Sequence, residues 1–266
     1  MTIPSESGLC EPEFIRVAEQ MADAARPIAR RYFRAGVTVD QKADNTMVTT
    51  ADREIEATMR AIIGAAFPDH EICGEEEGGV VRADGYQWVL DPIDGTSAFV
   101  MGAPTFGVLI ALALDGVPIL GIIDQPISGE RWVGAAGRGA TFNGARINTR
   151  DRAGLNEALV FTTAPEYFEE PGDLIAFNGV AQQARSVRYG ADCYGFGLVA
   201  MGYVDLVVEA SLKPWDYAAI VPVVSEAGGI VTDWRGAPLT LESDGHVLAA
   251  GGPICHAAAL ARLKPR

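Results

Sequence analysis

Apolar residues recur near the start of the chain at steps of three and four, the spacing of one helix face. From Phe14 to Ile28 this spacing predicts an amphipathic helix, which Pro27 should kink. A second helix is predicted from Ala51 to Phe67, with Thr49 or Thr50 available as its N-cap. Two helices that each bury one face should therefore come first.

The pattern then changes to short β-rich runs, the first two of which are residues 71–73 and 86–90. The apolar run 107–114, the pair Asp115-Gly116 and the run 117–124 together predict a hairpin, because Asp-Gly readily adopts positive φ angles. Further short strands are predicted around residues 131–135 and 140–147. These runs predict an antiparallel sheet.

Beyond residue 149, predicted strands and helices alternate. The strands are expected at 158–163, 186–188, 204–209, 230–232 and 246–250, and the helices from Cys193, from Asp216 to Gly228-Gly229, and over 254–263. We therefore expect two lobes that form one functional unit. The first is an α+β lobe over residues 1–148, and the second is an α/β lobe over residues 149–266.

Composition and charge narrow the possible functions. The 266 residues carry a formal net charge of −14, so a nucleic-acid or anionic-membrane partner is not expected. The four cysteines are widely spaced without a C-x-x-C pair, which argues against zinc and suits a cytoplasmic protein. The N-terminus has no signal-peptide pattern, and no apolar run is long enough to span a bilayer.

The segment Asp91-Pro92-Ile93-Asp94-Gly95-Thr96 is the most informative. Two carboxylates follow a predicted strand, and the Ile93 carbonyl lies between them as a third oxygen ligand for a hard cation such as Mg²⁺. An ordinary Asp-Pro and Asp-Gly turn would leave the same pattern. If a helix begins at Ser97, three backbone amides could bind phosphate oxygens: those of Gly95, Thr96 and Ser97.

Two further acids could join this pair. Glu75 opens an acidic run that is typical of a solvated loop. If residues 71–73 form a strand, however, Glu75 follows that strand just as Asp91 follows the predicted strand 86–90. Asp216 precedes a predicted helix and could be simply its cap. Packed in one cleft these acids would repel, and a bound cation is the simplest way to neutralise them.

Four ordered motifs make the chain resemble the inositol monophosphatase superfamily of magnesium-dependent phosphatases over almost its whole length. The motifs are V-T-T-A-D ending at Asp52, G-E-E at 74–76, W-V-L-D-P-I-D-G-T at 88–96, and W-D-Y-A-A-I-V-P-V-V-S-E-A-G-G at 215–229. The resemblance implies a layered αβαβα sandwich of the inositol monophosphatase and fructose-1,6-bisphosphatase type. It also implies a homodimer.

The same resemblance implies roles for the acids. Glu75, Asp91 and the Ile93 carbonyl would hold one Mg²⁺, and Asp91, Asp94 and Asp216 a second, within a set of two or three ions. Three residues would orient the attacking water at the metal: Thr96, Glu75 and Asp52. The substrate phosphate would lie on the amides after Asp94, and hydrolysis would need no covalent phosphoenzyme.

The substrate is harder to predict. The sequences of residues 121–132 and 189–202 most resemble those of the histidinol-phosphatase branch, whose substrate carries an ammonium group and an imidazole. Asp192 and Glu209 would favour such a cation, although they could also be a helix-cap acid and a strand-end acid. Lys42 is a further candidate contact or a solvated charge. Inositol-1-phosphate, other sugar or nucleotide phosphates, and a non-catalytic regulatory role are the alternatives.

Overall fold

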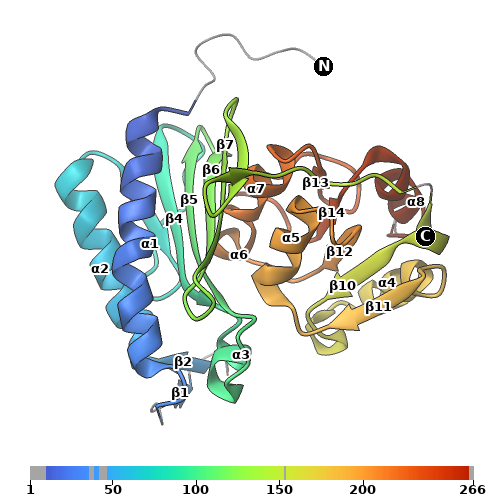
Figure 1. Cartoon of the computed structure of the whole chain (residues 1–266), viewed down its shortest axis with the longest axis horizontal. Helices are drawn as coiled ribbons and strands as arrows, with labels where there is room; N and C mark the ends of the chain where they lie inside the picture. The colour runs from blue at the N-terminus through green and yellow to red at the C-terminus, as the bar shows by residue number, and fades with distance from the viewer. Residues whose placement is uncertain (1–9, 36–38, 42–46, 153, 264–266) are drawn as a thin grey trace.

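The computed structural model describes residues 10–35, 39–41, 47–152 and 154–263. Helices and sheets alternate in five layers (Figure 1). A helical pair covers a seven-stranded sheet, and a middle layer of helices separates that sheet from a five-stranded one. Two more helices cover the far side of the second sheet. The expected αβαβα sandwich is confirmed.

The helices that cover the seven-stranded sheet are α1 (Pro12–Tyr32) and α2 (Thr50–Ala66), and their apolar faces pack on that sheet. Helix α1 runs through Pro27 and ends five residues later. The predicted N-cap of α2 is confirmed as Thr49, whose Oγ1 accepts the Ala51 N–H at 3.1 Å. The short strands β1 (Val39–Gln41) and β2 (Met47–Thr49) pair antiparallel just before α2.

The seven-stranded sheet follows chain order from β3 to β9, and β3 and β4 form its parallel pair. The predicted Asp115-Gly116 turn is confirmed, with φ angles of 50° and 75°. Along β5, alternate residues enter the core on one face and then the other, so the run is apolar throughout. The strands are β3 (Glu71–Gly74), β4 (Tyr86–Asp94), β5 (Gly107–Leu114), β6 (Val117–Gln125), β7 (Glu130–Ala135), β8 (Gly139–Phe142) and β9 (Ala145–Arg146).

The five-stranded sheet has the order β11-β10-β12-β14-β13, with β10 parallel to both of its neighbours. Its strands are β10 (Leu159–Thr162), β11 (Ser186–Tyr189), β12 (Leu206–Glu209), β13 (Ile230–Thr232) and β14 (Val247–Ala250). Helices α5 (Asp192–Ala200), α6 (Pro214–Tyr217) and α7 (Ile220–Ser225) lie between the two sheets, and α4 (Asp173–Ala181) and α8 (Pro253–Leu263) cover the outer face. The lobe boundary after residue 148 stays a prediction.

Two predicted elements are divided in the structure. The predicted strand 140–147 is broken at Asn143-Gly144, where both residues adopt positive φ. The predicted helix from Asp216 to Gly228 is interrupted after α6, because Pro222 has no N–H to donate to the Ala218 carbonyl one turn earlier. The interruption leaves Asp216 on a helical turn of its own.

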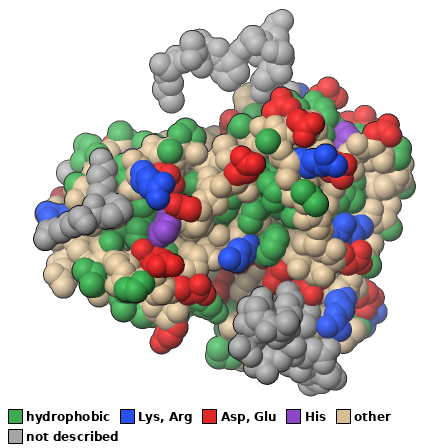
Figure 2. All heavy atoms as spheres, turned by 180° about the vertical axis from the view of Figure 1, so that it is seen from behind, with side chains coloured by type: hydrophobic (Ala, Val, Ile, Leu, Met, Phe, Trp, Pro, Cys, Tyr) green, Lys and Arg blue, Asp and Glu red, His purple; other side chains and the backbone are tan. Residues whose placement is uncertain are grey.

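On the face shown in Figure 2, basic side chains lie among acidic ones. No helix in the part of the chain that the structure describes is long and apolar enough to cross a bilayer.

Candidate active site

Three carboxylates converge where β4 ends and α6 begins. Asp91 and Asp94 flank an irregularity in the pairing of β4 with β5, and such irregularities re-aim side chains. One oxygen from each of Asp91, Asp94 and Asp216 lies within 4.8 Å of the others. Acids separated by more than 120 positions in the sequence therefore share one site.

Asp216 combines the capping role considered from the sequence with a place in the three-acid group. Its Oδ2 accepts the Lys213 N–H at 2.7 Å, so it caps the first turn of α6. The same carboxylate lies in the three-acid group, so capping holds it in place beside Asp91 and Asp94.

Glu75 reaches the site from the neighbouring strand. The Glu75 N–H donates to the Leu90 carbonyl at 3.1 Å, which extends the parallel pairing of β3 and β4 by one residue. Glu75 is close enough that its charge raises the pKa values of Asp52, Asp91 and Asp216. The predicted juxtaposition of Glu75 and Asp91 on adjacent strands is therefore present.

Burial and mutual repulsion raise the pKa values of all three clustered acids. Burial raises the pKa of Asp91 well above its usual range, and the charges of Glu75, Asp94 and Asp216 raise it further. Burial, followed by the charge of Asp192, raises that of Asp94. Burial raises the pKa of Asp216 to about 7, even though the Lys213 N–H lowers it. The site therefore favours binding protons or another cation.

Asp52 lies in the first turn of α2 beside this group. Its Oδ2 accepts the Thr49 N–H at 2.9 Å and the Thr49 hydroxyl at 2.5 Å. Its Oδ1 is buried and has no hydrogen-bond partner among the described residues. Burial raises the pKa of Asp52 to about 6. One oxygen of Asp52 caps the helix, while the other remains available for a water or a proton.

The turn after Asp94 leads directly into α3 (Thr96–Met101), so the helix expected near Ser97 is confirmed. Gly95 has a φ of 77°, a left-handed conformation that suits glycine. Thr96 Oγ1 donates to the Ile93 carbonyl at 3.2 Å, and that carbonyl keeps a second lone pair. In the first helical turn, the amides of Thr96 and Ser97 have no carbonyl partner within α3.

The start of α5, in the helical layer between the two sheets, packs against this turn. The Cys193 N–H donates to Asp94 Oδ2 at 2.7 Å, and Thr105 Oγ1 donates to Asp192 Oδ2 at 3.4 Å. A Cβ atom added to Gly95 would lie 2.8 Å from Asp192 Cγ, so Asp192 touches the backbone of the turn. Burial raises the pKa of Asp192 to about 6.

Glu209 is a buried carboxylate at the end of β12, with 3% of its surface exposed. Its Oε1 accepts the Thr163 N–H at 2.7 Å and the Thr163 hydroxyl at 3.0 Å, and its Oε2 accepts the Thr162 hydroxyl at 3.2 Å. The charge of Asp192 acts on Glu209, so the two acids are neighbours. Lys42 lies outside the described residues.

Two neighbours of the site were missed by the sequence reasoning. The Tyr167 hydroxyl, from the 3-10 turn Pro165–Tyr167, lies 3.5 Å from Ser97 Oγ, which is 70 positions earlier in the sequence. Thr105 precedes β5 and contacts Asp192, which lies 87 positions later. Neither residue belongs to a motif, and no local pattern marks contacts across such separations.

The donor set fits a hard divalent cation. Carboxylate and carbonyl oxygens are the ligands that Mg²⁺ prefers, and burial together with mutual repulsion raises the pKa values of the clustered acids, which a bound cation would offset. The residues that could hold such ions are Glu75, Asp91, the Ile93 carbonyl, Asp94 and Asp216.

Comparison with known proteins gives one consistent result. A family model described as "Inositol monophosphatase family" matches residues 11–264. The chain is 43% identical to "Bifunctional phosphatase IMPL2, chloroplastic" of Arabidopsis thaliana, over 98% of this chain and 78% of that protein. It is 37% identical to a histidinol-phosphatase of Chlorobaculum parvum, over 88% and 91% of the two chains. A solved inositol monophosphatase from Zymomonas mobilis superposes with a TM-score of 0.86 at 46% identity, covering 94% and 97% of the two chains.

Proposed function

The chain belongs to the inositol monophosphatase family, and from that premise we propose that it hydrolyses histidinol phosphate to histidinol and phosphate with Mg²⁺. Phosphomonoester hydrolysis follows from the family, while the particular ester is our proposal. The observation that carries the metal-dependent hydrolysis is the convergence of Asp91, Asp94 and Asp216 to within 4.8 Å.

We assign the metal ligands to the clustered acids, with Glu75 and the Ile93 carbonyl completing a set for two or three ions. The chemistry that Mg²⁺ supplies when bound is polarisation of the phosphate oxygens and a lower pKa for a coordinated water. The phosphate would be bound by three backbone amides at the start of α3, those of the N-cap Gly95 and of Thr96 and Ser97 in the first turn.

Proton transfer is assigned to the chain's own residues. Asp52 Oδ1 would accept a proton from the attacking water, because this oxygen is unpaired in the described structure and the pKa of Asp52 is raised to about 6. The Thr96 hydroxyl would orient that water through a lone pair while its hydrogen stays on the Ile93 carbonyl. Glu75 would help to orient the same water.

Asp192 and Glu209 support a cationic leaving group. Asp192 contacts the turn that would hold the phosphate, and its charge acts on the buried Glu209, so the two acids lie near each other. Histidinol carries an ammonium group and an imidazole, which two acids would stabilise better than they would a neutral polyol. The resemblance of residues 121–132 and 189–202 to the histidinol-phosphatase branch points the same way.

A substrate panel tests the proposal. Histidinol phosphate should be hydrolysed with a higher kcat/KM than inositol-1-phosphate at saturating Mg²⁺, and activity should disappear with a chelator. Asp192→Asn should lower the ratio of the two kcat/KM values about 10–100-fold, because one charged contact is lost. Asp84→Asn, an exposed acid before β4, is the matched control.

The panel also separates the alternatives. A preference for inositol-1-phosphate would reject histidinol phosphate as the substrate, and equal turnover of many esters would indicate a broad phosphatase. No phosphate release from any ester, with Mg²⁺ bound, would favour the regulatory role.

A further inference from the structure

Helix α2 carries three polar residues on one face, spaced four apart: Asp52, Glu56 and Arg60. Residues at this spacing lie one above the other along a helix. The side chain of Glu56 is fully buried, and that of Arg60 is 20% exposed. Of the three residues, the proposed mechanism uses Asp52. The other two point to the turn that follows β3.

The carboxylate of Glu56 binds the backbone of that turn. Glu56 Oε2 accepts the Glu76 N–H at 2.7 Å, and Glu56 Oε1 accepts the Glu77 N–H at 3.0 Å. Arg60 Nε donates to Glu56 Oε1 at 2.8 Å, so the buried negative charge is paired. Both oxygens of Glu56 are therefore engaged by groups within 3.0 Å.

The turn is also closed at its ends. The Gly74 N–H donates to the Gly78 carbonyl at 3.0 Å, and an Arg60 guanidinium nitrogen donates to the same carbonyl at 2.6 Å. A Cβ atom added to Gly74 would lie 2.2 Å from Glu56 Oε1, so the carboxylate rests directly against the backbone. Glu75 stands between two residues that touch Glu56.

We propose that Glu56, supported by Arg60, is the positioning residue that holds Glu75 ready for the metal. This inference rests on the proposed function, in which Glu75 is a metal ligand. Hydrogen bonds from backbone amides to a buried carboxylate are strong and keep the turn ordered before the ion arrives. Without them, ion binding would also have to order the turn, so affinity for the ion would fall.

The direct test is Mg²⁺ binding measured by calorimetry on the full chain at one pH. Glu56→Gln keeps one oxygen acceptor but presents an NH₂ group to the second donor, and Glu56→Ala removes both acceptors. Both variants should raise the Mg²⁺ dissociation constant about 10–100-fold, the usual effect of losing a residue that orients a metal ligand. At saturating Mg²⁺, KM for the ester should stay near the wild-type value.

The matched control is Glu71→Gln. Glu71 lies on β3 just before the turn and pairs with Arg82 at 3.2 Å on the exposed surface. This variant makes the same chemical change, but its Mg²⁺ dissociation constant should equal that of the wild type. Equal Mg²⁺ binding by folded Glu56→Gln and wild-type protein would overturn the inference. A wild type that binds no Mg²⁺ would overturn the proposed function instead.

Hydrogen exchange of the wild-type protein gives a second test that needs no variant. In the metal-free protein, the amides of Glu76 and Glu77 should exchange at least about 100-fold more slowly than in an unstructured peptide, because they are bound to Glu56. Exchange at the unstructured rate would show that the turn is not held in advance, and would also overturn the inference.

Discussion

At the scale of single residues, the acids of the site differ in what stabilises them. Asp94 accepts the Cys193 N–H, Asp216 accepts the Lys213 N–H, and Asp52 accepts two bonds from Thr49. Each of these acids is held by a group at the N-terminus of a helix, of α5 for Asp94, α6 for Asp216 and α2 for Asp52, before any cation binds. Preorganisation of this kind lets mutually repelling groups remain close together.

Asp94→Asn should abolish phosphate release with little loss of folding. The asparagine carbonyl can still accept the Cys193 N–H, but the variant lacks a charge that the metal site needs. We expect turnover to fall by about 100-fold or more, measured as phosphate released at saturating Mg²⁺. In chelator, the melting temperature should be equal to or above that of the wild type, because repulsion with Asp192 and Asp216 is relieved. Unchanged turnover would refute the metal role.

Glu209 should make stability depend on pH. Burial raises its pKa to about 8, against an ordinary value of 4.5. Because the folded pKa is the higher one, the protonated acid contributes stability that is complete below about pH 4.5 and is lost as pH rises through 8.

Glu209→Gln cannot ionise, so it should become more stable relative to the wild type by about 1–4 kcal/mol between pH 5 and pH 8.5. The measurement is urea unfolding in chelator at both pH values. Glu166→Gln, on the exposed turn Pro165–Tyr167, is the matched control. A difference between Glu209→Gln and wild type that does not vary with pH would contradict the assignment.

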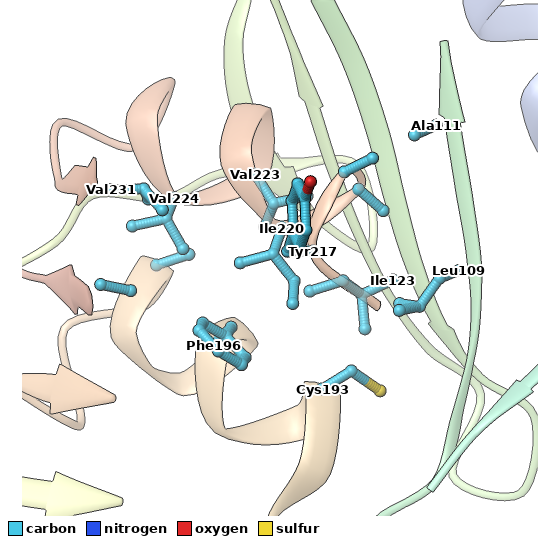
Figure 3. Packing of buried hydrophobic residues seen from close by; sticks show 14 of the residues in the cluster. Leu109, Ala111, Ile123, Cys193, Phe196, Tyr217, Ile220, Val223, Val224 and Val231 are labelled. Atoms are coloured by element: carbon cyan, nitrogen blue, oxygen red, sulfur yellow. The ribbon is translucent and has the colours of Figure 1, made fainter. Parts of the chain in front are cut away.

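At the scale of elements, the middle helices approach the large sheet where two glycines pair across its strands. Gly121 of β6 is in register with Gly134 of β7. A Cβ atom at Gly121 would lie 1.9 Å from the Ala219 carbonyl oxygen, and one at Gly134 would lie 2.3 Å from that of Pro222. Around this contact, Tyr217, Ile220 and Val223 pack with Ile123 and Leu109 of the sheet (Figure 3).

Gly121→Ala should therefore be destabilising, by about 1–3 kcal/mol or more, because the added methyl group meets backbone that cannot rotate away. Gly64→Ala is the matched control on the exposed side of α2, where nothing lies within 4 Å of the added atom. That variant should be more stable by about 0.5–1 kcal/mol, because alanine favours a helix. Denaturant unfolding measures both, and equal effects would contradict the close approach.

At the scale of the whole molecule, an ion bound by residues of two different layers should stabilise the fold. Asp91 and Asp94 lie on β4 of the large sheet, Glu75 directly follows β3 of the same sheet, and Asp216 comes from the helical layer between the sheets. An ion among them would link these layers and lower the repulsion within a chain of net charge −14.

Mg²⁺ at 100 times its dissociation constant should raise the free energy of unfolding by about 2.7 kcal/mol. At one fixed Mg²⁺ concentration, the effect should be larger at pH 8 than at pH 5.5, because the raised pKa values, about 7 for Asp216, make protons compete with the ion and raise its dissociation constant as pH falls. Calorimetric melting measures the shift. An equal shift from NaCl at matched ionic strength would attribute it to screening of surface charge instead.

Much of the fold and the core of the site could be predicted from the sequence, because their signals are local. Apolar spacing located α1 and α2, and Asp115-Gly116 located a hairpin turn. The Asp91 to Thr96 segment and the family motifs also predicted that acids distant in the sequence lie close together. They could do so because, in a family of known fold, the positions of the motifs in the tertiary structure are already known.

The tertiary structure decided what depends on contacts between segments distant in the sequence. The binding of Glu56 to the 76–77 amides, the packing of Asp192 on Gly95, and the pairing of Gly121 with Gly134 leave no local pattern. Acidic residues and glycines are common in loops and strands, and their types do not reveal their partners. Hydrophobic periodicity records which face of an element is buried, and the folded chain determines what lies against that face.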